Sequence, residues 1–101
     1  MDTKSLIADT KARFSHNAAK AYLKDKYKSK FIVASQGGLW VANLETITFL
    51  STFKDDFLIL IDTFDNPVKV DRMELRNKLG STYESVMNDW YKEWQELEKK
   101  R

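Results

Sequence analysis

The feature that most constrains this chain is an apolar run that meets a turn and then an alternating run. The first run is Phe57-Leu-Ile-Leu-Ile-Asp62, the turn residues are Thr63-Phe-Asp-Asn66, and the second run is Pro67-Val-Lys-Val-Asp-Arg72. Two such runs around a turn predict a β-hairpin. The first strand is apolar at nearly every position, which is typical of a strand buried on both faces. The second alternates and leaves one face to solvent.

Length and composition predict a single domain spanning residues 1–101, with a core that needs neither disulfides nor metals. The chain has no cysteine, which excludes thiolate metal sites and thiol chemistry and suits a reducing cytoplasm. No apolar run approaches the ~18 residues of a membrane span, and the N-terminus lacks a signal-peptide core. We therefore expect a cytoplasmic protein without a membrane partner.

Positive charge is concentrated at the N-terminus, where residues 1–30 carry eight Lys or Arg against three acids. Residues 3–28 contain no Gly or Pro and predict a helix that packs through one face, made of Ile7, Phe14, Ala18 and Tyr22. A second face carries a cationic stripe, made of Arg13, Asn17, Lys20, Lys24 and Lys28. The stripe has two interpretations: a solvated helix face, or a surface that follows nucleic-acid phosphates.

The remaining segments predict a second hairpin and a final helix. The turn 35–38 joins two short apolar strands, residues 31–34 and 39–42. Residues 44–53 are ambiguous, because their threonines favour a strand whereas their apolar residues have helical spacing; we expect a long bent strand. Residues 72–79 predict a short strand or the start of a helix, ended by Gly80. Ser81 and Glu84 form a capping box for a helix over 81–99.

Few residues are candidates for chemistry. His16, the only histidine, lies on a helix flank that we expect to be solvated, so we expect no catalytic site. Asp55 and Asp56 are turn-forming acids, and we expect no metal or cofactor. Trp40 is either a core residue or a partly exposed ring that stacks on a base. Trp90 and Trp94, at helical spacing, predict a core or an interface.

The order of these elements resembles that of the Sm and Sm-like (LSm) family. The segments that carry the resemblance are Phe53-Lys-Asp-Asp-Phe57, Leu58-Ile-Leu-Ile61 and Val70-Asp-Arg72. The chain looks most like Sm-like proteins of cyanophage origin from marine metagenomes. The resemblance implies a mainly β fold with flanking helices: a small, bent five-stranded barrel over 30–79, preceded by a helix over 3–28 and followed by an extra helix over 81–99. It also implies a homo-oligomeric ring of five to seven subunits that binds single-stranded RNA or DNA.

On the matching positions, the resemblance implies that Lys54 and Arg72 contact phosphates or base edges and that Phe53 or Phe57 stacks. The expected nucleic-acid-binding residues are therefore Lys54, Arg72, Phe53, Phe57, Arg13, Lys20, Lys24, Lys28 and Trp40. The predicted function is non-enzymatic nucleic-acid binding in RNA or DNA processing, in the host cytoplasm if a phage encodes the protein. The alternative is a phage assembly protein or host-takeover adaptor that binds proteins through Trp90 and Trp94 of the C-terminal helix.

Overall fold

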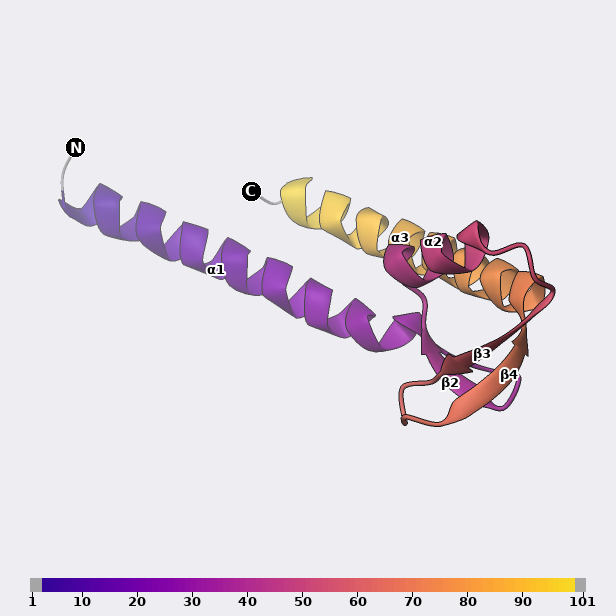
Figure 1. The fold of residues 1–101 in the computed structure, drawn as a ribbon. Helices are drawn as coiled ribbons and strands as arrows, with labels where there is room; N and C mark the ends of the chain where they lie inside the picture. The colour runs from indigo at the N-terminus through magenta and orange to yellow at the C-terminus, as the bar shows by residue number, and fades with distance from the viewer. Residues whose placement is uncertain (1–2, 100–101) are drawn as a thin grey trace.

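The structure is a computed structural model that describes the backbone of residues 3–99 and the side chains of residues 15–99. Its elements follow one another along the chain as Figure 1 shows. They are α1 (Thr3–Lys28), a 3-10 turn η1 (Ser29–Phe31), β1 (Ile32–Ser35), β2 (Gly38–Val41), α2 (Leu44–Thr52), β3 (Phe57–Ile61), β4 (Pro67–Asp71) and α3 (Arg72–Lys99).

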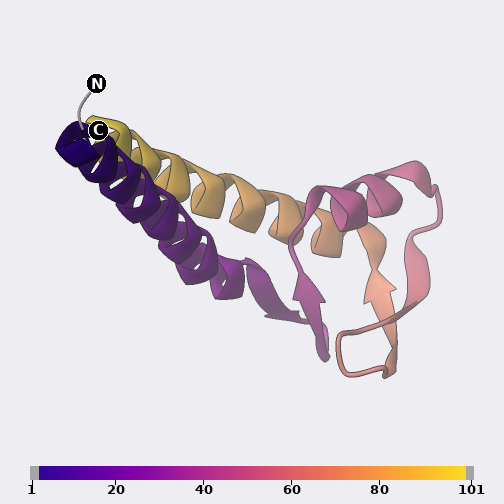
Figure 2. The same ribbon diagram turned by 90° about the vertical axis from the view of Figure 1, so that its left-hand side faces the viewer.

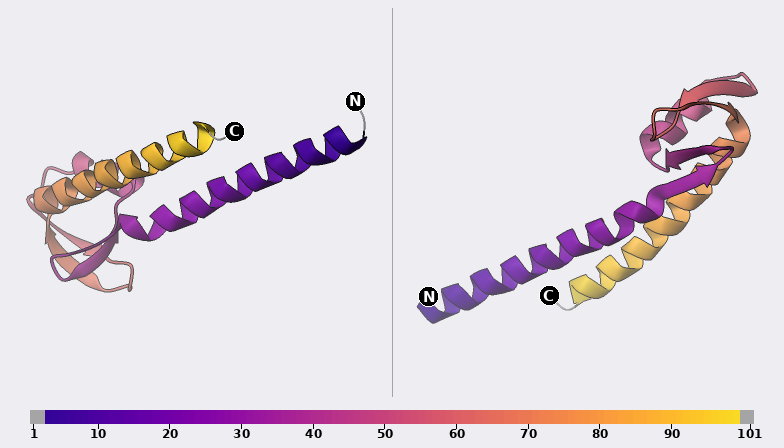
Figure 3. Two further views of the ribbon diagram at one scale, coloured as in Figure 1. Left: turned by 180° about the vertical axis from the view of Figure 1, so that it is seen from behind. Right: turned by 90° about the horizontal axis from the view of Figure 1, so that it is seen from below.

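The molecule is long and narrow. Its principal extents are 65 × 24 × 20 Å and its radius of gyration is 19.5 Å, whereas a compact chain of this length has a radius of gyration of about 13 Å. The helices α1 and α3 run in opposite directions and form an arm, and both hairpins and α2 gather at the other end of the molecule (Figures 1 and 2). The views from behind and from below show the same arrangement (Figure 3).

The predicted mainly β fold with a five-stranded barrel is wrong. Helices dominate the described residues, and the strands form two separate two-stranded sheets, β1–β2 and β3–β4, with no closed barrel within 3–99. The expected long bent strand over 44–53 is instead α2. The side-chain oxygen of Asn43 caps this helix by accepting a hydrogen bond from the Thr46 N–H at 2.8 Å. Burial of Leu50 on its inner side outweighs the strand preference of its threonines.

The final helix is also longer than predicted. Residues 81–99 are helical as predicted, and 72–79 form the start of a helix, the second of the two alternatives. Because α3 begins at Arg72 and continues through Gly80, the expected end of the barrel at residue 79, the helix end at Gly80 and the capping box at Ser81 are wrong. The cap is Asp71, whose carboxylate accepts a hydrogen bond from the Glu74 N–H at 3.1 Å. The first half of α3 buries Leu75 and Leu79, and the second half buries Val86. Because both halves pack on the rest of the protein, the helix continues through Gly80.

Both predicted hairpins are confirmed. In the first, Gln36 and Gly37 have positive φ angles of 54° and 82°, as a tight hairpin turn requires. A Cβ atom on Gly38 would lie 2.6 Å from the Trp40 ring, so the glycine lets the indole lie close to the backbone. In the second hairpin β3 pairs with β4, with Phe57 opposite Asp71.

Two apolar clusters hold these elements together. The larger one joins the strands, α2 and the first half of α3, and consists of Val33, Trp40, Ala42, Leu50, Val70, Leu75 and Leu79. The smaller one joins α1 to α3 through Leu23, Tyr27 and Val86, and the Trp90 ring stacks on Tyr27 with centroids 6.0 Å apart. The predicted packing face of α1 is wrong in its described part, because Ala18 and Tyr22 are exposed. The side chains of Ile7 and Phe14 lie outside the described residues.

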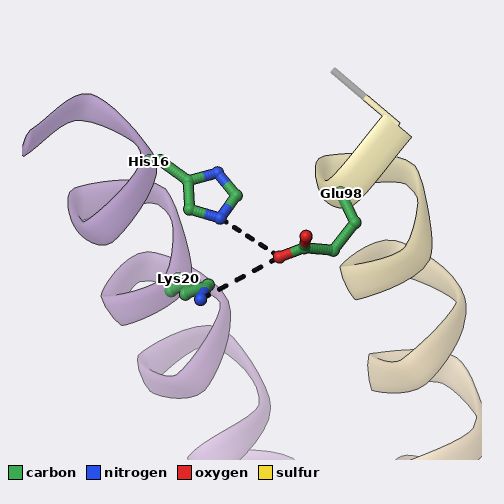
Figure 4. A network of polar contacts seen from close by, with 3 residues as sticks. All are labelled: His16, Lys20 and Glu98. Atoms are coloured by element: carbon green, nitrogen blue, oxygen red, sulfur yellow. Dashed lines mark hydrogen bonds and ion pairs between the residues drawn. The ribbon is translucent and has the colours of Figure 1, made fainter. Parts of the chain in front are cut away.

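Polar contacts also join α1 to α3, beside the smaller apolar cluster. Figure 4 shows His16 and Lys20 of α1 beside Glu98 of α3, with the His16 Nε2 and Lys20 Nζ atoms 3.1 and 3.9 Å from its Oε1 atom. His16, expected to be solvated, thus lies at a helix–helix contact. Further along, Lys26 and Tyr27 donate hydrogen bonds of 2.6 and 2.7 Å to Glu93. The bond from Lys26, and to a smaller extent that from Tyr27, lowers the pKa of Glu93.

Candidate functional site

The residues predicted to bind nucleic acid do not form a single site. Phe53, Lys54 and Phe57 border the turn between α2 and β3, at the hairpin end of the molecule (Figure 1). Lys54 is exposed and is followed directly by Asp55 and Asp56. The Phe53 ring packs on Phe49 of α2, with centroids 4.7 Å apart. The turn therefore combines exposed aromatic rings with a negative balance of charge, which repels phosphate.

Arg72 lies beside this turn but is engaged within the chain. Its Nε atom donates a hydrogen bond of 2.7 Å to the Asp55 carbonyl, and its Nη1 atom donates one of 2.9 Å to the Leu50 carbonyl. Its backbone N–H donates to the Asp56 carbonyl at 2.9 Å. Arg72 therefore ties the end of α2 to the start of α3, and binding a phosphate would compete with these contacts.

Of the two interpretations of Trp40, the structure supports the core residue and contradicts the partly exposed ring. Its side chain is 4 % exposed and belongs to the larger apolar cluster. The indole N–H donates a hydrogen bond of 2.9 Å to the Ser35 carbonyl across the hairpin. With its ring packed and its donor satisfied, Trp40 is a core residue.

The cationic stripe lies on the arm, apart from the turn between α2 and β3 (Figure 1). Lys20 is near Glu98, which partly balances its charge. Lys24 and Lys28 are exposed, and neither forms an ion pair with another described residue. The side chain of Arg13 lies outside the described residues. Of the stripe lysines that the structure describes, Lys24 and Lys28 are therefore the two without an ion pair, and they lie one helical turn apart.

The aromatic residues of the C-terminal helix divide between the core and the surface. Trp90 is half-buried and stacks on Tyr27, so it holds α1 against α3. Trp94 stacks on Tyr91 with centroids 5.8 Å apart, and both are exposed. Of the two tryptophans expected to anchor a partner, only Trp94 is available at the surface.

Asp62, which was not among the predicted site residues, accepts several backbone hydrogen bonds where the two hairpins meet. Asp62 is 7 % exposed, and its carboxylate accepts backbone N–H bonds of 3.0 to 3.1 Å from Asn66, Leu39 and Phe64. The Thr63 N–H also donates to the Leu39 carbonyl at 3.0 Å, so this corner joins the two hairpins. The signal in the sequence was an aspartate at the start of a turn cluster.

The bonds to Asp62 predict an acid-dependent loss of stability. The N–H of Asn66, followed by those of Leu39 and Phe64, lowers the pKa of Asp62 against the opposing effect of burial. A carboxyl group with a lowered native pKa stabilises the fold above its unfolded pKa of about 3.9, and this contribution is lost as pH falls through the native pKa. We expect the melting temperature to fall below about pH 4 and Asp62→Asn to flatten this fall. An unchanged pH profile in thermal scans of D62N would contradict this role; D65N is the matched control.

The β3–β4 sheet has an exposed face that we call the outer face. It consists of Phe57, Ile59, Ile61, Pro67, Lys69 and Asp71, which alternate along the two strands. Phe57, Ile59 and Ile61 are 57, 73 and 69 % exposed. The Lys69 ammonium lies 5.3 Å from the centroid of the Phe57 ring. The opposite, inner face packs Leu58, Leu60, Val68 and Val70 on the larger apolar cluster.

The outer face is suited to apolar contact. The sequence of β3 is typical of a strand buried on both faces, yet the single chain covers one face only. Ile61 also borders an open groove of about 400 Å³ between β2 and α2, which is lined by both apolar and polar side chains. Ile59 and Ile61 were not among the predicted binding residues, because the pattern placed them in the interior.

The structure and the comparisons add three further findings. Among the described residues, no group of His, Cys, Asp or Glu side chains is arranged to hold a metal ion. None of the described helices has the length and apolar character needed to cross a membrane. Comparison with known proteins finds no family model, no curated protein and no solved structure that matches this chain.

Proposed function

We propose that this protein is a non-enzymatic assembly module that works by binding protein through the outer face of the β3–β4 sheet. The observation that carries the proposal is the exposure of Phe57, Ile59 and Ile61, which occupy alternate positions along β3 and therefore share one face. An exposed apolar surface of this kind is a frequent mark of a protein–protein interface.

The energetics support a bound partner. Covering an isoleucine or phenylalanine side chain contributes about 1.5–3 kcal/mol, so three such residues are enough to form the centre of an interface. The charges of Lys69 and Asp71 lie on β4, beside the apolar row on β3. An apolar centre with polar neighbours is the usual anatomy of a protein interface.

Site-specific photo-crosslinking tests the proposal. A photoreactive phenylalanine derivative replaces Ile59 in the full chain, and irradiation takes place in the cells that naturally express the protein. We expect a covalent adduct with protein from position 59. The control is the same substitution at Thr48, an exposed residue of α2, which covers the inner face. Absence of an adduct at position 59, or equal adducts at both positions, would contradict the proposal.

Nucleic-acid binding is a second candidate function, favoured by the exposure of Lys24 and Lys28 without ion-pair partners among the described residues. Two phosphate contacts give weak, salt-sensitive binding. In fluorescence anisotropy with single-stranded RNA and DNA oligomers, we expect Lys24→Glu with Lys28→Glu to weaken binding by about tenfold or more and to reduce its salt dependence. Unaltered binding by the double variant would eliminate this surface.

A further inference from the structure

We infer that the partner which covers the outer face is a second copy of this chain. This inference rests on the proposed function, because it names the occupant of the same surface. Two observations carry it: the self-complementary character of the outer face and the composition of β3.

The outer face meets the requirement of a two-fold interface, in which one patch must fit itself. Ile59 lies at the centre of β3, with Phe57 and Ile61 two residues away on either side. The charged members are one lysine and one aspartate, Lys69 and Asp71, so the patch has no net charge. Two copies therefore meet without net repulsion, and apolar side chains face apolar side chains at the centre.

A second copy also accounts for the near-continuous apolar sequence of β3. Leu58 and Leu60 pack on the larger apolar cluster of their own chain. Stacking one outer face on another buries the alternate residues between two sheets, as in a β-sandwich. Each β3 strand is then buried on both faces, in agreement with its sequence pattern. In this arrangement Ile59 lies near the two-fold axis.

Sedimentation equilibrium of the purified full chain tests the inference over concentrations from about 1 to about 200 µM. We expect the mass to rise from 11.8 kDa towards twice that value. Ile59→Lys should weaken self-association by about 30-fold or more, because it places a charge at the centre of the interface. Thr48→Lys adds the same charge on α2 and should leave self-association unchanged. A wild-type mass that stays at 11.8 kDa throughout would overturn the inference, as would equal effects of the two variants.

A disulfide provides a second measurement that does not depend on weakening the interface. The chain has no cysteine, so Ile59→Cys introduces a single thiol. We expect mild oxidation to join two copies of I59C and to leave T48C mainly monomeric. Equal joining of both variants would overturn the inference. If the chain is monomeric but position 59 crosslinks to a different protein, the inference fails and the proposed function stands. If position 59 crosslinks to no protein, both fail.

Discussion

Replacing Trp40 with alanine is expected to lower the free energy of unfolding by about 3–5 kcal/mol, the usual cost of removing a large aromatic side chain from a core. Trp40 is 4 % exposed and packs in the larger apolar cluster. The substitution also removes the indole N–H, so the Ser35 carbonyl on the partner strand loses its hydrogen-bond donor. Equilibrium urea denaturation measures the effect. If the dependence of the free energy of unfolding on urea concentration is the same in both proteins, the variant and the wild type unfold between similar folded and unfolded states.

The matched control for Trp40 is an aromatic residue that the structure leaves exposed. Tyr22, on α1, is suitable, and Tyr22→Ala should change the free energy of unfolding by no more than about 0.5 kcal/mol. If Trp40→Ala were as mild as Tyr22→Ala, Trp40 would not be a core residue. A base-stacking role would then be open again.

Replacing Gly80 with proline is expected to cost about 3 kcal/mol or more, because a proline inside a helix removes a hydrogen bond and collides with the preceding turn. Gly80 lies inside α3, between the half that packs on the strands and the half that packs on α1. Breaking the helix there separates the two clusters. Circular dichroism and urea denaturation measure the loss of helix and of stability.

Alanine at position 80 is expected to raise the free energy of unfolding, whereas proline lowers it. A Cβ atom on Gly80 meets no other atom within 4 Å, so the position has room for a side chain. Gly80→Ala should therefore stabilise the protein by about 0.5–1 kcal/mol, the helix preference of alanine over glycine. If proline were tolerated and alanine were neutral, Gly80 would mark a break between elements and α3 would not be continuous.

Both hairpins could be predicted from the sequence because their signals are local. The turn at Gln36 and Gly37 follows from residues that accept positive φ, and the second hairpin follows from two runs around a turn cluster. These preferences act within a few residues. Distant packing did not alter the outcome.

The longer-range features could not be predicted in the same way. The threonines of residues 44–53 favour a strand, but capping by Asn43 and burial of Leu50 decide for α2. Gly80 and Ser81 have the local character of a helix boundary, but α3 packs on both sides of them. The burial of Leu50 and the packing of both halves of α3 outweigh local preferences of at most about 1 kcal/mol per residue, whereas the cap at Asn43 is itself a local signal for the helix.

The candidate site was partly visible in the sequence. The apolar run of β3 was recognised, but its pattern indicated burial on both faces and therefore hid Ile59 and Ile61 as surface residues. In the isolated chain the inner face is covered and the outer face is not. The expected binding residue Arg72 has the charge to contact phosphate, but its donors are used to hold α2. Sequence alone does not show which donors a fold will use.

The most direct test of the central claim is a photo-crosslinking scan along β3, one position at a time from 57 to 61, in the full chain. The outer face predicts an alternating pattern, with adducts from positions 57, 59 and 61 and few or none from 58 and 60. The same alternation should be present whether the captured protein is a second copy or another chain. Adducts without alternation, or adducts mainly from positions 58 and 60, would contradict the claim that the outer face binds protein.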